Sequence, residues 1–563
     1  MILLSKYIFV IWGDNMYKKL GEKIKELTIE LTEIPSIVGS KEEINVVNRI
    51  YEKFKNMEYF KENPDKVRLV DVIDDKLGRK SVLAIVKGKK GNSNKTVVLI
   101  GHTDTVGISD YAHIEKYATK PLVLREKLKE LSISEDARKD LESGNYLFGR
   151  GIFDMKCGVA ILMTIVEELS KDIDNLEGNI VFAAVCDEEG NSGGMLSIVP
   201  ELVSLKKEEN FDYQAIIDTD YMAPRYEGDK NRYVYVGTVG KIMPSFYIVG
   251  SEAHAGDPFK GIDPSHISSA IMEEINFNTK YCDEAEGEVT VPPISLRQQD
   301  LKKEYSVQTA KSSYLYFNFG THKSTPDEIM KKVIEGASLA FQKVIDNLNI
   351  EYEKYCKSNK FPHERLPWKA RVLSFAELLE KVREEKGEEL DKLIDELSKK
   401  LLADENIDER LYALKIVEAV YNLWSDKDPI VIAYFSPPYY PHIYVKGENE
   451  LERRLLNAVN KTIETTETNY NILMRKFYPY ISDLSYGAAP REKNAIDSLK
   501  DNMPGFGVKY SLPLEDMQEL SLPVVNIGPF GKDAHKFTER LEEDYSFNVV
   551  PELVYKTIKE LLK

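Results

Sequence analysis

Residues 97–104 read Val-Val-Leu-Ile-Gly-His-Thr-Asp, an apolar run that ends in a histidine and, two residues later, an aspartate. The run predicts a strand buried on both faces, as in a parallel sheet covered by helices. In open α/β sheets the functional residues collect at the carboxyl ends of strands. The stretch therefore predicts a site at His102 and Asp104, although such a histidine, taken alone, is more often structural.

Similar apolar runs alternate with helical patterns on both sides of this stretch. Buried strands are predicted at residues 81–86, 180–186 and 215–217, and a long apolar helix at 158–169. Strands that alternate with helices in this way are the βαβ signature of a largely parallel sheet with helices on both faces.

The pattern changes near Arg232, where alternating strands begin, and the α/β pattern resumes from about Gly447. We predict a discontinuous α/β domain with a mostly parallel central sheet, in two parts at 1–232 and 447–563, interrupted at 233–446 by an α+β lid domain. The lid is enlarged by three amphipathic, charge-rich stretches that are predicted to be helical: 327–355, 374–402 and 406–424.

The bulk composition indicates a globular protein without a nucleic-acid or membrane partner. The 563 residues are 42% hydrophobic and 30% charged, and no window approaches the roughly 18 uninterrupted apolar residues of a membrane span. A net charge of -17, with no dense stripe of Lys and Arg, argues against nucleic-acid binding.

A cytoplasmic location is expected from the cysteines and from the start of the chain. Four widely separated cysteines form no CxxC pair, which predicts reduced thiols rather than disulfides or a thiolate zinc site. Residues 1–12 superficially resemble a signal peptide, but they lack a strong n-region and a small-residue cleavage site. Met16 is an alternative start.

A second motif surrounds Asp154 with glycines just before the predicted apolar helix. Residues 148–158 read Phe-Gly-Arg-Gly-Ile-Phe-Asp-Met-Lys-Cys-Gly. Small residues permit close backbone approach, which suits a metal ligand, but Asp154 could equally cap the helix. On this segment alone, the two interpretations are equally good.

A third motif places adjacent carboxylates at the end of a buried strand. Residues 185–194 read Val-Cys-Asp-Glu-Glu-Gly-Asn-Ser-Gly-Gly. Adjacent acidic residues on a helix usually belong to a solvent-exposed face. Here they follow a predicted buried strand, so they are expected at the edge of the sheet. There, one acid can bind a metal while its neighbour acts as a general base toward water. Histidine and carboxylates without a thiolate suit zinc.

In order and approximate spacing, the three motifs resemble those of the co-catalytic zinc peptidases and amidohydrolases, the family of acetylornithine deacetylase, succinyl-diaminopimelate desuccinylase, aminoacylase and carboxypeptidase G. The likeness covers essentially the whole chain except the helical insertion, and it continues at residues 250–258, 481–483 and 534–539. It is closer to the RocB-like, arginine-utilisation branch, which has a similarly enlarged lid and the Asp-Thr-Asp-Tyr run seen at 218–221.

Carried over residue by residue, the resemblance implies two zinc ions, with Co²⁺ or Mn²⁺ as substitutes. Asp154 would bridge the two ions. Asp218 competes with Asp220 for one place, because residues two apart on a strand point to the same face, and Asp220 is preferred. The implied ligands are His102 and Asp220 at one ion, Glu189 and His535 at the other, and Asp154 at both.

The resemblance also implies roles for Glu188 and His254, and the spacing of His102 and Asp104 indicates a role for Asp104. Glu188 would be the general base, and His254 of the lid would stabilise the developing oxyanion. Asp104 would hydrogen-bond the second ring nitrogen of His102 and fix its tautomer. In many relatives the lid histidine enters the partner subunit's site, so a homodimer is expected unless the extra helices replace the partner.

The implied function is a zinc-dependent hydrolase that cleaves an amide or peptide bond in a small amino-acid-derived substrate or short peptide, in arginine or other amino-acid catabolism. Asn318-Phe319-Gly320 stands where relatives commonly place an arginine that holds a substrate carboxylate, so deacylase, dipeptidase and carboxypeptidase activities all stay open. Cys157 stands where glycine is usual, a smaller departure. Two other interpretations are a relative that has lost catalysis and a scaffold centred on the charged helices.

Overall fold

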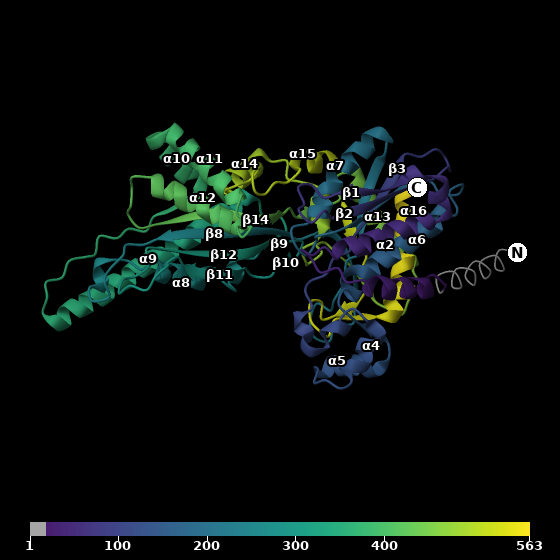
Figure 1. The fold of residues 1–563 in the computed structure, drawn as a ribbon, viewed down its shortest axis with the longest axis horizontal. Helices are drawn as coiled ribbons and strands as arrows, with labels where there is room; N and C mark the ends of the chain where they lie inside the picture. Colours follow the sequence, from purple (N-terminus) through teal and green to yellow (C-terminus); the bar gives the residue numbers. More distant parts are fainter. Residues whose placement is uncertain (1–18) are drawn as a thin grey trace. The chain divides into compact units, whose positions relative to one another are not determined.

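The computed structural model describes residues 19–563, so the expectations about residues 1–12 and Met16 lie outside the described residues. The described chain forms two compact units (Figure 1). The first comprises residues 19–238, Ile443–Ala489 and Pro513–Lys563, and the second comprises Val239–His442 and Pro490–Leu512. The domain limits expected from the sequence, 1–232, 233–446 and 447–563, stay a prediction.

The first unit is built around a large mixed sheet whose central strands β5, β3, β6 and β17 run parallel to one another. Its outer strands pair mostly antiparallel. The predicted α/β class with a mostly parallel central sheet is confirmed. In spatial order the strands are β1 (Val67–Asp71), β2 (Lys80–Lys87), β5 (Asn179–Val185), β3 (Lys95–His102), β6 (Asp212–Asp218), β17 (Val524–Asn526), β7 (Arg232–Thr238) and β15 (Ile443–Tyr444), with β16 (Ile472–Arg475) beside β7.

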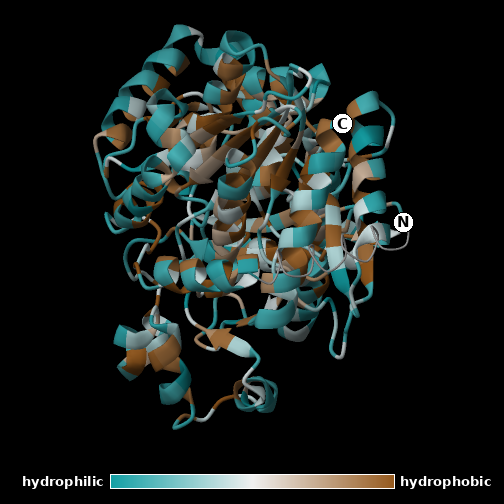
Figure 2. Ribbon diagram, turned by 90° about the vertical axis from the view of Figure 1, so that its right-hand side faces the viewer, coloured by the Kyte–Doolittle hydropathy of each residue, from teal (hydrophilic) through white to brown (hydrophobic). Residues whose placement is uncertain are grey.

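Helices cover both faces of this sheet because its strands are apolar on both sides. Val97 and Leu99 of β3 join one core, whereas Val98 and Ile100 are equally buried and point to the opposite face. Figure 2 shows the hydrophobic strands enclosed by helices with hydrophilic outer turns. The helices that contact the sheet include α2 (Glu43–Asn56), α6 (Cys157–Ser170), α7 (Gly193–Glu208), α13 (Glu450–Thr465) and α16 (Val550–Leu562).

The second unit has its own five-stranded sheet, with the order β11-β12-β8-β14-β13. Tyr247, Tyr314 and Ile432 of this sheet pack against the insertion helices α10, α11 and α12 in a separate core. The bounds are β8 (Gly240–Val249), β11 (Ile294–Asp300), β12 (Ser312–Thr321), β13 (Val372–Ser374), β14 (Ile430–Tyr440), α8 (Pro264–Ile275), α9 (Pro326–Asn359), α10 (Phe375–Lys386), α11 (Glu388–Leu402), α12 (Glu409–Leu423) and α14 (Lys493–Asn502).

The helices predicted in the insertion are present, with one difference. The stretch 374–402 forms two helices instead of one, because Gly387 adopts a positive φ of 54° between α10 and α11. Ser374 begins α10 with a capping box that Glu377 completes. Across residues 19–563, no helix combines the length with the apolarity needed to cross a membrane.

Candidate metal centre

The strand register brings the three sequence motifs to one edge of the large sheet. In the parallel pairing of β3 with its neighbours, His102 lies opposite Val185 of β5, and Ile100 lies opposite Asp218 of β6. The residues that follow β5 and β6, among them Glu188 and Asp220, therefore emerge beside His102. Asp154 comes from η3 (Ile152–Lys156), and His535 comes from the loop between β18 (Gly531–Lys532) and β19 (Arg540–Glu542).

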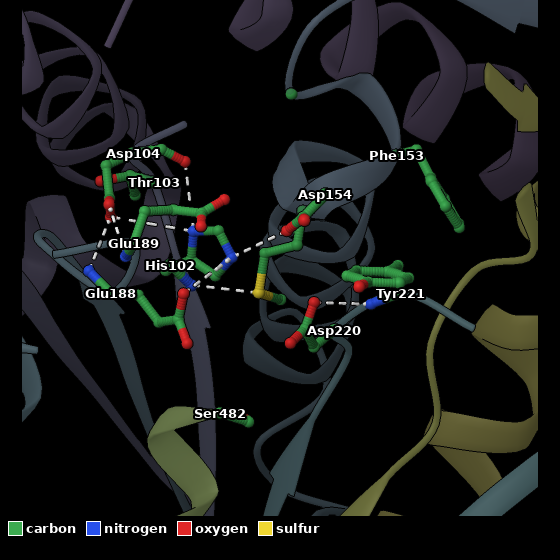
Figure 3. A network of polar contacts seen from close by, with 12 residues as sticks. His102, Thr103, Asp104, Phe153, Asp154, Glu188, Glu189, Asp220, Tyr221 and Ser482 are labelled. Carbon is green, nitrogen blue, oxygen red and sulfur yellow. Dashed lines mark hydrogen bonds and ion pairs between the residues drawn. The ribbon is translucent and has the colours of Figure 1, made fainter. Parts of the chain in front are cut away.

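Asp154 lies between two histidines. Its Oδ1 is 3.1 Å from Nε2 of His102, and its Oδ2 is 3.0 Å from Nε2 of His535. Nε2 of His535 also lies 2.9 Å from Oε1 of Glu189. Figure 3 shows His102 between Asp154 on one side and Asp104 on the other.

The charges in this centre shift the titration of its members. Burial opposes the ionisation of Asp154, but hydrogen bonds from His102 and His535 outweigh it and hold the pKa of this carboxyl below its usual range. Burial likewise lowers the pKa of His535, whereas its contacts with Asp154 and Glu189 raise that pKa to about 10. The buried carboxylates thus favour positive charge on the histidines, and bound cations would supply such charge instead.

The donor atoms of the centre fit a pair of cations that share one carboxylate. Ligand atoms of His102, Asp154 and Asp220 lie within 4.8 Å of one another, and so do those of Asp154, Glu189 and His535. A third set of this kind joins His102 with Glu188 and Glu189. Imidazole nitrogens and carboxylate oxygens without thiolate match the ligand preference of zinc, cobalt or manganese.

Asp220, and not Asp218, lies in the set with His102 and Asp154. The Asp218 carboxylate is engaged elsewhere, because its Oδ2 accepts a 3.0 Å hydrogen bond from Ser482 and its Oδ1 accepts one of 2.7 Å from the Thr219 amide. Burial raises the pKa of Asp218 to about 6. The two aspartates differ in this way because β6 ends at Asp218, so strand alternation does not continue to Asp220.

Asp104 holds the turn that carries the two glutamates. Its Oδ1 accepts a 3.1 Å hydrogen bond from the Glu188 amide, and its Oδ2 accepts one of 3.0 Å from the Glu189 amide. The ring of His102 contacts the backbone carbonyl of Asp104 at 3.1 Å, whereas the Asp104 carboxylate is 3.8 Å from the ring. The expected contact with Nδ1 is thus made by the carbonyl, which keeps Nε2 directed at Asp154.

The side chain of Glu188 is 9% exposed and lies beside the candidate ligands. Its Oε2 lies 3.9 Å from Nε2 of His102. Burial, followed by repulsion from carboxylates such as Asp483, raises the pKa of Glu188 well above its usual value, against the lowering effect of His102. Glu188 thus adjoins the two donor sets that contain Asp154, and its ionisation is disfavoured there.

His254 belongs to the second unit, whereas the residues of this centre belong to the first. It is exposed in the loop after β8, and its Nδ1 accepts a 3.0 Å hydrogen bond from the Gly256 amide. Within the first unit, the structure brings together the seven predicted site residues that this unit contains. The brought-together set is His102, Asp104, Asp154, Glu188, Glu189, Asp220 and His535.

Several residues around the centre carried no functional signal in the sequence. Glu43 lies in the first turn of α2, where acidic residues are common, so nothing in the sequence singles it out. In the structure its Oε2 accepts a 3.0 Å hydrogen bond from the Asp187 amide. An aromatic wall beside Asp220 was also missed, since scattered aromatic residues usually indicate core packing. In this wall, Tyr221 packs against Phe153 and Tyr480, with ring centroids 4.9 and 4.8 Å away.

Comparisons with known proteins agree with these motifs. The family model described as peptidase family M20/M25/M40 matches residues 98–559. Protein RocB of Bacillus subtilis (strain 168) is 35% identical over 545 residues, which cover 96% of this chain and 95% of RocB. YqjN of the same organism, described as uncharacterized, is 35% identical over 548 residues, which cover 96% of this chain and 97% of YqjN. The aminopeptidase PepT from Bacillus cereus shares the fold, with a TM-score of 0.51 at 13% identity, over 96% of this chain and 99% of PepT.

Proposed function

Given that the chain belongs to peptidase family M20/M25/M40, we propose that it uses two divalent cations to cleave an amide or peptide bond in a small amino-acid-derived substrate. Membership makes the protein a hydrolase of the metallopeptidase and amidohydrolase type. One observation carries the proposal of two cations: Asp154 belongs to two of the three donor sets, one with His102 and Asp220 and the other with Glu189 and His535.

Zinc is the proposed metal, with Co²⁺ or Mn²⁺ as substitutes, because the donors are nitrogen and oxygen only. The chemistry that bound cations supply in such a site is to polarise the substrate carbonyl and to lower the pKa of water toward neutrality. Asp104 keeps the ring of His102 oriented through its carbonyl and keeps the glutamate turn in place through its carboxylate.

Glu188 is the proposed general base. It accepts a proton from the attacking water, stays close to the reacting carbonyl, and returns the proton to the leaving amine. Its position beside His102, with its amide fixed by Asp104, supports this role. Glu189 is turned to His535 instead, which supports its role as a ligand.

The substrate side of the proposal rests on the resemblance and on the surroundings of the centre. Tyr221 and Tyr480, both partly exposed, provide flat apolar surface close to Asp220. The likeness to RocB makes arginine derivatives the first compounds to test among acyl-amino acids and dipeptides. Because residues 250–258 resemble the lid histidine motif of the family, His254 is the proposed oxyanion donor.

The test combines metal analysis with a substrate panel. Carefully loaded protein should contain close to two equivalents of zinc and should hydrolyse at least one member of a panel of acyl-amino acids and dipeptides that includes arginine derivatives. Asp154→Asn is the control, since it removes the shared ligand and should abolish both properties. Wild-type protein that binds no divalent cation would contradict the proposal.

A further inference from the structure

Glu539 is completely buried and contacts the segment that carries Asp154. Its Oε1 accepts hydrogen bonds from three backbone amides of that segment: Gly151 at 2.9 Å, Phe153 at 3.3 Å and Asp154 at 3.4 Å. Backbone N–H groups buried away from water need an acceptor. One carboxylate oxygen thus accepts the hydrogen bonds of the irregular backbone segment that leads into Asp154.

Arg150 balances the charge of Glu539 and anchors it. The guanidinium is 1% exposed, and its Nη1 donates to Oε2 of Glu539 at 2.8 Å. Its Nη2 donates to both carboxylate oxygens of Asp110 at 2.9 Å, and its Nε donates to the carbonyl of Gly107 at 3.2 Å. Charge-assisted hydrogen bonds of this kind are stronger than neutral ones, so Glu539 has a fixed position.

The loop that contains Glu539 also carries His535, a candidate ligand, and it is fixed at its other end. Arg540, completely buried, donates to Oδ2 of Asp533 and to Oδ2 of Asp140, the second at 2.6 Å. One loop therefore supplies His535 to the centre and holds the backbone of Asp154, the residue placed between the two histidines.

We propose that Glu539 is a positioning residue that sets the place of Asp154, and thereby the affinity of the centre for its cations. This inference rests on the proposed function. With Glu539 shortened or neutralised, the amides of Gly151 to Asp154 lose a charged acceptor, and the Asp154 carboxylate is free to move from its place between His102 and His535. Loss of such an outer partner typically lowers metal affinity by about 10- to 100-fold.

The experiment measures Zn²⁺ and Co²⁺ binding to the full-length protein by competition with a chelator. Glu539→Ala and Glu539→Gln should bind at least one cation about 10- to 100-fold more weakly than wild type. The visible absorption spectrum of the Co²⁺-loaded variants should also differ from that of wild type, because the geometry at Asp154 has changed. A role in folding alone would leave both measurements unaltered for the folded protein.

A matched control is Glu542→Gln, three residues further along the chain. Glu542 is also buried, and its carboxylate accepts from the Tyr545 amide at 3.1 Å and from the Tyr470 hydroxyl at 2.9 Å. It makes comparable hydrogen bonds without touching residues 150–154, so its variant should bind both cations as wild type does.

A milder variant covers the case in which neither Glu539→Ala nor Glu539→Gln folds. Glu539→Asp keeps the charge that faces Arg150 but withdraws the oxygen from the three amides, and it should also weaken cation binding. If wild type binds two cations and the folded Glu539 variants bind them equally well, the inference is wrong and the proposed function stands. If wild type binds no cation, both are wrong.

Discussion

Glu188 and Glu189 are neighbours in the chain with different surroundings in the structure. Both amides are held by Asp104, and the turn sends the two side chains to different partners. Glu189 contacts His535 at 2.9 Å, whereas Glu188 lies 3.9 Å from His102. The pair therefore offers an internal comparison between a proposed ligand, Glu189, and a proposed base, Glu188.

We predict different defects from the same substitution at these two positions. Glu188→Gln should keep its zinc and lose about 10²- to 10⁴-fold in turnover, the usual contribution of a general base. Glu189→Gln should lose zinc affinity as well, because a ligand is removed. Metal content and turnover, measured on both variants, decide the matter, and exchanged phenotypes would show that the assignment is reversed.

Glu43 is a buried acid that supports the same turn from outside the ligand set. Its Oε1 accepts a 3.0 Å hydrogen bond from Arg79, which also donates to Asp187 at 2.6 Å. Burial and repulsion from Asp104 raise the pKa of Glu43 to about 7, against the lowering effect of Arg79. The folded protein thus favours the protonated form of this group more than the unfolded chain does.

This shift predicts a pH dependence of stability. An acid whose pKa is raised from 4.5 to about 7 on folding contributes most to stability below pH 4.5 and loses that contribution as the pH rises through 7. Gln does not titrate. The free energy of unfolding of wild type relative to Glu43→Gln should therefore be lower at pH 8 than at pH 5, as measured by urea unfolding. A difference that is equal at both pH values would contradict the prediction.

At the residue level, the sequence predicted the candidate ligands better than their supports. His102, Asp154 and Glu189 stand in short motifs whose residue types already indicate metal chemistry. Glu43 contacts a residue that lies 144 positions further along the chain, and Glu539 contacts one that lies 385 positions earlier. No local sequence pattern encodes pairings at such separations. The structure brings the candidate ligands together, and their individual roles stay predictions.

At the level of elements, close packing of α6 on the sheet depends on a glycine. A Cβ atom at Gly158 would lie 2.1 Å from the carbonyl oxygen of Thr219, the residue before Asp220. The apolar run at residues 158–169 predicted the helix, but only the tertiary structure shows why residue 158, in its first turn, must lack a side chain. The strand order could not be predicted either, since apolar strands pair equally well in many orders.

We predict that Gly158→Ala destabilises the protein by about 2 kcal/mol or more, because backbone must move to accept the methyl group and overpacking typically costs about 1 to 3 kcal/mol. It should also lower metal content, since Thr219 adjoins Asp220. Urea unfolding and metal analysis measure the two effects. The control is Gly107→Ala, because a Cβ atom there meets nothing within 4 Å. Equal behaviour of the two variants would contradict the prediction.

At the level of the whole molecule, the predicted fold class is confirmed, whereas the limits of the domains stay a prediction. Residues 490–512 were expected within the second part of the α/β domain, and they pack with the second unit. In this segment, Asn502 accepts a 3.0 Å hydrogen bond from the Ala376 amide, and the Tyr510 hydroxyl accepts one from the Tyr439 amide at 3.0 Å. An amphipathic helix such as α14 indicates that one face is buried, but not against which core.

His254 carries the prediction that concerns the whole molecule, because it lies on the unit that does not contain the candidate ligands. By resemblance it is the oxyanion donor. His254→Ala should therefore keep metal content and fold while turnover falls by about 10²-fold or more. The alternative is that His254 has only a structural role, in which its ring accepts a hydrogen bond from the Gly256 amide within a turn. In that case stability would change, and the turnover of the folded fraction would not.

Mixing His254→Ala protein with Glu188→Gln protein distinguishes two routes by which the histidine could act. Each variant lacks one group that the other retains, so a dimer that exchanges histidines would contain one site with both Glu188 and His254. Recovered activity would mean that the histidine is donated by a partner subunit. No recovery in demonstrably mixed dimers would mean that each chain supplies its own histidine. Activity of His254→Ala alone at the wild-type level would exclude both routes.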